Sequence, residues 1–285
     1  MIDASSAGDD VTDTSAWLPD QTTWVPAETD TTRPSAARVY DFLLGGGHNF
    51  AADRAAAARI EQVLPNARRV ARSNRAFLRR AVRFMAEQGI TRFLDLGSGI
   101  PTVGNVHEIA RDANPESRVV YVDFESVAVA HSRLLLDGDE RTAVVEADLT
   151  DPGTVLADPA VRALLDTDEP VGLLLVAVFH FVPDHGDPAG LVGRYLSALP
   201  AGSLAAISHL TADFDAEGMA QVAETMANSP NPMFFRPFDR VAPLFAELDL
   251  VEPGLVDADL WRPEPGVTDP DGPARGVYAG VGRVR

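Results

Sequence analysis

Three aspartates follow three short apolar segments of the chain, and the first of them stands beside a glycine turn. The first segment leads into Asp95-Leu96-Gly97-Ser98-Gly99, and the next two end at Asp123 and Asp148. Glycines at such a turn let the backbone approach a ligand closely, because a Cβ atom would collide with it. Thr102 stands where a dinucleotide-binding fingerprint has its third glycine, and no Gly-Lys pair of a phosphate-binding loop follows. The pattern favours a nucleotide-type ligand other than NAD or ATP.

The acidic residue before the first glycine indicates which ligand to expect. The carboxylate of Asp95 would repel a pyrophosphate, yet it suits a ligand with an ammonium group. S-adenosylmethionine has an ammonium and a sulfonium, so we expect it as the cofactor, with S-adenosylhomocysteine as its product form. Asp123 could accept both ribose hydroxyls, and Asp148 could accept from the exocyclic amine of adenine. The alternative is that each aspartate only caps a following helix or turn. The cofactor contacts expected from this region are Asp95, Gly97, Ser98, Gly99, Asp123, Asp148 and Leu149.

Two histidines end or follow later apolar segments. Ligands of open α/β sheets bind outside the carboxyl ends of the strands, so His180 and His209 could orient or deprotonate a substrate nucleophile. Phe179 or Phe181 could flank the adenine or the sulfonium. The alternative is that both histidines are core residues whose ring nitrogens are hydrogen-bonded within the protein. A metal site at His180, Asp184, His185 and Asp187 is conceivable, but a solvated loop is the favoured interpretation there, and we expect no metal.

Composition excludes several classes of chemistry. The 285 residues include no cysteine, and all 24 basic residues are arginine. These absences exclude disulfides, thiolate nucleophiles, lysine Schiff bases and a Walker lysine. The net charge of −18 argues against nonspecific nucleic-acid binding. With no long apolar run and no secretory signal, we expect a cytoplasmic protein that does not bind membranes.

Short apolar segments alternate with helical stretches after Gly89, and this order predicts a doubly wound, mostly parallel, Rossmann-like α/β sheet. The candidate strands are 92–96, 118–122, 142–146, 171–179, 203–209, 248–252 and 276–284. Helical periodicity before them predicts helices over 35–44, 49–63 and 68–88. The resulting division is a disordered or lid-like acidic tail over 1–32, a helical cap over 33–90 and a cofactor-binding core over 91–285.

Several motifs resemble an actinobacterial family of S-adenosyl methyltransferases, long known as a domain of unknown function. They include Ala37-Arg38-Val39-Tyr40-Asp41, Asn49-Phe50-Ala51-Ala52-Asp53-Arg54, the turn around Gly97, and Val120-Tyr121-Val122-Asp123. The resemblance implies a class I methyltransferase fold, with a seven-stranded sheet whose last strand is antiparallel, behind a helical cap. The aspartates and glycines named above match its cofactor positions. Where the family tends to have Asp-Asn-Asp-Pro, this chain has Asp123-Phe124-Glu125-Ser126; Glu125 could replace the second acid, and Phe124 could stack on adenine.

The cap contributes further candidates for the site. Tyr40 and Asn49 flank a glycine loop, and Arg75 on an arginine-rich helix could pair with the methionine carboxylate of the cofactor. Solvation is the alternative fate of such an arginine. The favoured function is methyl transfer to an oxygen, nitrogen or carbon of a small molecule. The alternatives are a regulatory protein that binds S-adenosylmethionine without turnover, or a cyclase-type enzyme on the same fold. A homodimer is one option for the assembly.

Overall fold

The computed structural model describes residues 25–26, 29–101, 104–264, 266 and 271–285. Most of the predicted acidic tail (1–32) therefore lies outside the described residues, as does Thr102. Within the described residues, no helix is both long enough and apolar enough to span a bilayer.

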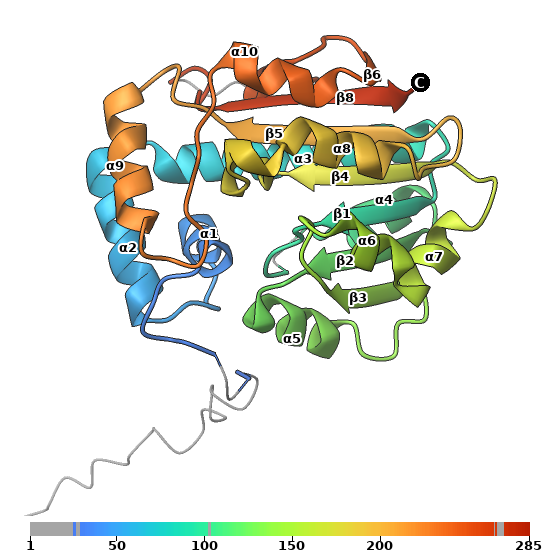
Figure 1. Cartoon of the computed structure of the whole chain (residues 1–285), viewed down its shortest axis with the longest axis horizontal. Helices are drawn as coiled ribbons and strands as arrows, with labels where there is room; N and C mark the ends of the chain where they lie inside the picture. The colour runs from blue at the N-terminus through green and yellow to red at the C-terminus, as the bar shows by residue number, and fades with distance from the viewer. Residues whose placement is uncertain (1–24, 27–28, 102–103, 265, 267–270) are drawn as a thin grey trace, which may run out of the picture.

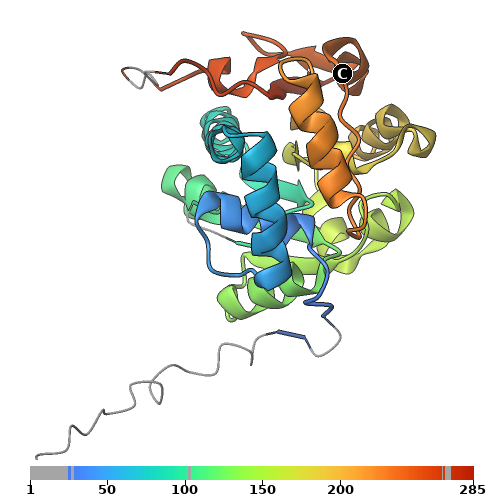
Figure 2. The ribbon, with the colours of Figure 1, turned by 90° about the vertical axis from the view of Figure 1, so that its left-hand side faces the viewer.

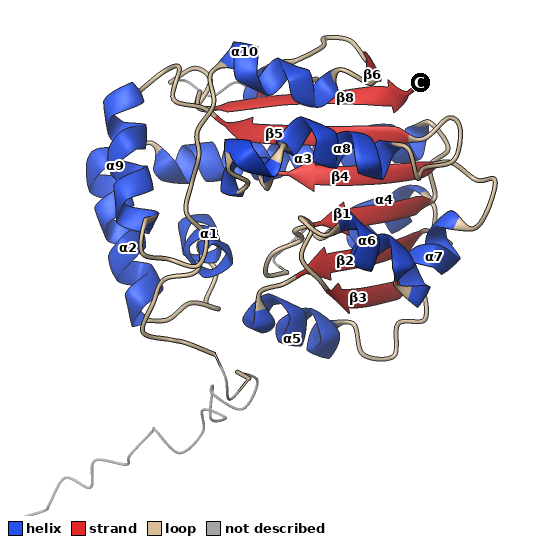
Figure 3. Cartoon of the chain, in the orientation of Figure 1, coloured by secondary structure: helices blue, strands red, loops and turns tan. Residues whose placement is uncertain are grey.

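A mostly parallel sheet forms the centre of the molecule (Figures 1 and 3). Its order is β3-β2-β1-β4-β5-β8-β6, and β8 runs antiparallel to both β5 and β6. The strands are β1 (Arg92–Leu96), β2 (Arg118–Asp123), β3 (Thr142–Glu146), β4 (Val171–Val176), β5 (Leu204–Leu210), β6 (Leu248–Leu250), β7 (Val256–Asp257) and β8 (Val277–Val284). The expected Rossmann-like class I methyltransferase sheet, with its last strand antiparallel, is confirmed.

The other strand bounds agree with the prediction to within two residues, but two details of the sheet differ more. The sheet has eight strands because the two-residue β7 pairs with β8, and so short a segment leaves no periodicity to detect. The fourth strand ends at Val176 and does not continue to residue 179. Ala177 has a positive φ of 58°, and a 3₁₀ turn, η2 (Phe179–Phe181), follows it. The apolar run therefore continues beyond the point where the backbone leaves the strand.

Helices cover both faces of the sheet. In Figure 1, α6 (Pro152–Ala157), α7 (Pro159–Leu165) and α8 (Pro188–Leu196) lie in front of it, and α3 (Ala67–Glu87) and α4 (Val106–Ala113) lie behind. Along β1, Leu94 packs in the front core and Phe93 in the rear core. Successive side chains of a strand point to opposite faces, so a strand buried on both faces carries apolar residues at successive positions. The other helices of the core are α5 (Ser126–Leu135) and α10 (Phe238–Val241).

A separate group of helices lies beyond the carboxyl ends of the parallel strands. In Figure 2, α1 (Ala36–Leu44), α2 (Ala51–Val63) and α9 (Ala216–Met226) face the viewer in front of those strand ends. They share an apolar cluster, to which Ala67 and Ala71 at the start of α3 also belong. We call α1, α2 and α9 the cap. The third helix of the predicted cap, α3, packs mainly against the sheet and α4, and α9, from after β5, takes its place in the cap.

A buried ion pair joins the cap to the core. Nε of Arg38 lies 2.9 Å from Oδ2 of Asp53, and Nη1 lies 2.7 Å from Oε1 of Glu125. Arg38 is on α1, Asp53 on α2, and Glu125 caps the N-terminus of α5. Removing one partner of such a pair leaves an uncompensated buried charge. These contacts therefore fix the position of the cap relative to the end of β2.

Candidate active site

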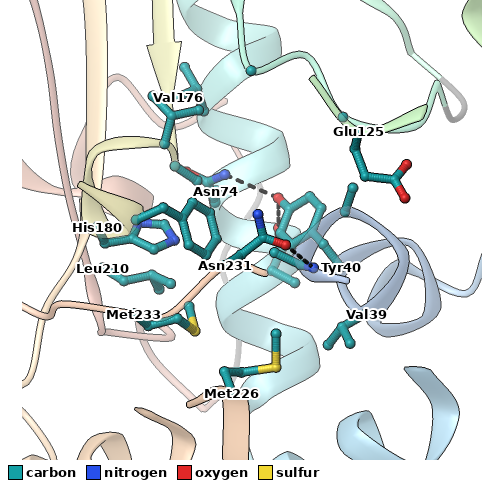
Figure 4. A pocket seen from close by; sticks show the side chains of 18 of the residues that line it. Val39, Tyr40, Asn74, Glu125, Val176, His180, Leu210, Met226, Asn231 and Met233 are labelled. Atoms are coloured by element: carbon teal, nitrogen blue, oxygen red, sulfur yellow. Dashed lines mark hydrogen bonds between the residues drawn. The ribbon is translucent and has the colours of Figure 1, made fainter. Parts of the chain in front are cut away.

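A pocket of about 380 Å³ lies between the carboxyl ends of the parallel strands and the cap. Ligand pockets of open α/β sheets form at this edge, because all the parallel strands end there. At its floor lie the loops that follow β1, β2, β3 and β4. Its roof is formed by α1, the end of α2 and α9, with α3 along one side; Figure 4 shows part of its lining.

The glycine turn after β1 forms one wall of the pocket. Gly97 has a φ of 73° and Gly99 a φ of 65°, both in the left-handed region that favours glycine. The N–H of Gly97 donates to the carbonyl of Val122 at 2.7 Å, which links the turn to the end of β2. A Cβ at Gly97 would overlap the side chain of Val178. Because Gly97, Ser98 and Gly99 all line the pocket, a ligand can lie against their backbone.

Asp123 ends β2 and is buried beside that turn. Its Oδ2 accepts from the N–H of Gly99 at 2.7 Å, and its Oδ1 accepts from the N–H of Glu125 at 2.9 Å. Burial raises the pKa of this carboxyl. Each carboxylate oxygen can accept more than one hydrogen bond, so both can still receive a ribose hydroxyl.

The residues after Asp123 differ in what they can offer a ligand. The carboxylate of Glu125 accepts from the N–H of Ala128 and from Arg38, so it belongs to the junction between cap and core. Glu125 also lines the pocket, so a second acid for the ribose at this position stays a prediction. Phe124 lines the pocket with 48% of its surface exposed, as a residue that could cover a ligand.

Asp148 and Leu149 follow β3 and line the same pocket. The Oδ1 of Asp148 accepts from the N–H of Thr150 at 2.8 Å. The carbonyl of Leu149 accepts from the hydroxyl of Tyr195 at 2.8 Å, and its side chain packs in the core. Both residues thus have fixed positions at the third strand end, as the sequence predicted.

Asp95 and Arg75 add an acidic and a basic side chain to the lining of the pocket. Burial raises the pKa of Asp95 to about 7, against the lowering effect of Arg75. Nη2 of Arg75 donates to the carbonyl of Gly104 at 3.3 Å, whereas its buried Nε has no hydrogen-bond partner among the described residues. A buried carboxyl and an incompletely bonded guanidinium suit the ammonium and carboxylate of an amino-acid moiety. The residues present therefore fit the methionine part of S-adenosylmethionine.

The two candidate histidines differ in their access to the pocket. His180, on η2, lines it, and its Nδ1 has no partner within the described chain. Burial, with the nearby His209 and Arg236, lowers the pKa of His180 well below the ordinary value, so its imidazole is neutral at pH 7. His209 does not line the pocket. Its Nδ1 lies 2.6 Å from the carbonyl of Leu210, and Nη1 of Arg236 lies 3.0 Å from its Nε2. With both nitrogens engaged, His209 fits the alternative of a satisfied core histidine.

Three other candidates divide in the same way. Tyr40 lines the pocket and donates to the carbonyl of Ala71 at 3.0 Å. Phe179 is fully buried in the sheet core, and its neighbour Phe181 lines the pocket instead. Asn49 lies outside the lining and donates to Oδ2 of Asp41 at 2.9 Å, which supports the glycine loop after α1.

Several pocket residues carry no signal in the sequence. Asn74 lies on α3 and Asn231 in the loop after α9, and both are buried polar side chains of the lining. Neither belongs to a motif. The contact of Asn231 with α1 is to the N–H of Ala36, which lies 195 residues earlier in the chain. In the described part of the chain, no group of His, Cys, Asp and Glu side chains is arranged to hold a metal ion. Asp184, considered above as a ligand, pairs with Arg236 and Arg240.

Comparison with known proteins identifies the family. The model of the S-adenosyl methyltransferase family matches residues 22–285. A solved DUF574-family protein from Streptomyces avermitilis MA-4680 is 40% identical, with a TM-score of 0.86 over 90% of this chain and 99% of that chain. A Thermobifida fusca YX structure with a provisional methyltransferase assignment is also 40% identical, with a TM-score of 0.85 over 92% and 99%. None of the curated proteins compared with the chain matches it. The chain belongs to the S-adenosyl methyltransferase family and is an S-adenosylmethionine-dependent methyltransferase.

Proposed function

We propose that this enzyme methylates a small molecule held in the pocket between the strand ends and the cap. The observation that carries the proposal is the continuity of that pocket. One cavity is lined both by the cofactor-type residues after β1, β2 and β3 and by the cap helices. A cofactor at the floor would therefore share the cavity with an acceptor under the cap. Such enclosure holds two reactants together and keeps water out.

The floor of the pocket would hold the cofactor. Asp95 would bind its ammonium and Arg75 its carboxylate, while the backbone of Gly97, Ser98 and Gly99 would lie against it. Asp123 would accept the ribose hydroxyls, and Asp148, Leu149 and Phe124 would surround the adenine. Bound S-adenosylmethionine supplies an activated methyl group on a sulfonium and is left as S-adenosylhomocysteine after transfer. The chain's own residues would bind and orient the cofactor and the acceptor and keep water away from both.

His180 is the residue proposed to act on the acceptor. Its neutral imidazole can accept the hydrogen bond of an acceptor hydroxyl or amine, and can take up the proton that this group loses. The assignment rests on three features: its place in the lining, its unpartnered Nδ1 and its lowered pKa. His209 is left out of this role, because both of its nitrogens are occupied.

Replacing Asp123 by Ala should weaken S-adenosylhomocysteine binding by about 1–3 kcal/mol, because hydrogen bonds to a charged acceptor are lost. Isothermal titration calorimetry measures the affinity directly. Asp168→Ala is the matched control, since Asp168 is exposed and precedes β4 at the opposite end of the sheet. Equal affinities in the wild type and Asp123→Ala would contradict the ribose assignment.

Replacing His180 by Gln should lower methyl transfer by about 100-fold or more, the usual contribution of a positioned acid or base. Transfer is measured as label passing from methyl-labelled S-adenosylmethionine to compounds of a bacterial metabolite extract. Cofactor affinity should stay within about twofold, because the cofactor residues above do not include His180. His185→Gln, in an exposed turn, is the control. Retention of bound cofactor with no labelled product from the wild type would overturn the proposed methylation.

A further inference from the structure

The roof of the pocket is chemically unlike its floor. Six large apolar side chains of the cap line it, together with Met233 from the loop after α9. These six are Val39, Leu43, Ile60, Met219, Val222 and Met226. Three of the five methionines in the chain thus lie on this one cavity. Methionine is flexible and polarisable, and its sulfur makes favourable contacts with aromatic rings.

Charged side chains of the pocket lie at its floor and on α3, and the roof has none among the described residues. Among the described lining residues, the charged ones are Arg75, Asp95, Asp123, Glu125 and Asp148. All of them belong to α3 or to the strand ends and their loops, and none belongs to α1, α2 or α9. A charged acceptor under the cap would lose its hydration without gaining a partner, which is strongly unfavourable. The roof therefore selects against ions.

Most polar groups near the roof are already bonded to the protein. Oδ1 of Asn74 accepts from the hydroxyl of Ser208 at 2.6 Å, and its Nδ2 donates to the hydroxyl of Tyr40 at 3.0 Å. These bonds fix both side chains, which Figure 4 shows beside each other. Their role is to close the wall between α3 and α1 and to keep it in one conformation.

Asn231 and His180 retain hydrogen-bonding capacity. Oδ1 of Asn231 accepts from the N–H of Ala36 at 3.1 Å, which orients its amide, and its Nδ2 makes no hydrogen bond to the described residues. His180 lines the same cavity, and the loop that carries Asn231 continues to Phe234, whose N–H donates to the carbonyl of His180 at 2.6 Å. Both side chains are labelled in Figure 4. Asn231 can therefore donate to an oxygen of a bound molecule, and the neutral imidazole can accept from its O–H or N–H.

We propose that the cap half of the pocket is the acceptor subsite, and that it takes an uncharged aromatic molecule with a hydroxyl or amine beside its ring. This rests on the proposed function and deepens it. Methionines from α9 and the loop after it contact the ring, Asn231 binds its oxygen or nitrogen substituent, and His180 faces the same group. Because α9 and Asn231 both follow β5, the segment 216–233 determines which acceptor fits.

Methionine methyl groups provide a direct test of this subsite. The protein is labelled with [methyl-¹³C]methionine, and each signal is assigned by a single Met→Leu substitution. Phenol, indole and 1-naphthol are titrated as neutral probes, with and without saturating S-adenosylhomocysteine. We expect the Met219, Met226 and Met233 signals to shift together. Met85, fully buried between α3 and the sheet, is the internal control and should not move.

Two comparisons test the chemical class. The anion 1-naphthoate should bind at least about tenfold more weakly than 1-naphthol, because its charge has no partner under the cap. Asn231→Asp keeps the acceptor for Ala36 and removes the free donor, so it should weaken 1-naphthol about three- to tenfold. If no probe shifts the three methionine signals, or if 1-naphthoate binds as well as 1-naphthol, the proposal of an acceptor subsite for uncharged aromatic molecules is wrong. Calorimetry with S-adenosylhomocysteine is read separately, so a failure of the cofactor site is distinguished from a failure of this subsite.

Discussion

Asp95→Asn should abolish detectable cofactor binding and, at the same time, stabilise the cofactor-free protein. In the variant the cofactor's ammonium would be buried without its carboxylate, a loss of about 3–5 kcal/mol. That loss corresponds to an affinity at least about 100-fold weaker. Without cofactor, the buried carboxylate is itself unfavourable, because its pKa is raised to about 7 from the ordinary 3.8. Asparagine of similar size removes that charge.

The sign of the stability effect follows from proton linkage. The folded protein binds a proton at Asp95 more tightly than the unfolded chain, so the stability contributed by Asp95 is complete below pH 3.8 and is lost as pH rises through about 7. Above pH 7 the ionised group therefore destabilises the wild type by about 2–4 kcal/mol relative to asparagine. Urea unfolding at pH 8 and at pH 5 measures the difference, which should shrink at the lower pH.

Cofactor affinity in the wild type should depend on pH through the same group. Binding an ammonium requires Asp95 ionised, so affinity should fall as pH decreases below about 7, and binding there should release a proton. Calorimetry in buffers of different ionisation enthalpy detects that proton. Asp168→Asn, at an exposed position, should leave stability and binding unchanged. An Asp95→Asn variant that still binds cofactor, or that is less stable at pH 8, would show that Asp95 has neither role.

Gly97→Ala should destabilise the protein by about 2–4 kcal/mol, and Gly99→Ala by about 1 kcal/mol. Both glycines have positive φ angles, 73° and 65°, where an alanine is strained. Only at Gly97 would the added methyl overlap a core side chain, that of Val178; a Cβ at Gly99 has no atom within 4 Å. Overpacking of this kind adds about 1–3 kcal/mol to the strain. Urea unfolding of the two variants gives the comparison.

The two glycine variants should also separate stability from binding. Gly99 lines the pocket, and the space beside it is open. Its new methyl group should therefore obstruct the cofactor while leaving the fold nearly as stable as the wild type. Combining Gly97→Ala with Val178→Ala should restore part of the stability lost in the single variant, because the overlap is removed. Equal destabilisation by the two single variants would show that the contact with Val178 is unimportant.

The sequence by itself determined the sheet and the strand ends that line one half of the pocket. The predicted bounds of β1 and β3 coincide with the observed ones, because apolar runs bounded by turn residues are local signals. The sequence could predict that Asp95, Asp123 and Asp148 lie near one another, because all parallel strands end at one edge of the sheet. Gly97 and Gly99 could be interpreted as a close-approach turn, because their conformational freedom is a property of the residue itself.

Tertiary structure alone decided which side chains reach the part of the pocket under the cap. His180 and His209 were both candidates from the sequence, but Arg236, 27 residues after His209, occupies Nε2 of His209. The early end of β4 turns Phe179 into the core and Phe181 toward the pocket. The cap gained α9 and Asn231 through contacts that span up to 195 residues. Such contacts depend on packing between distant segments, which neither periodicity nor motif spacing records.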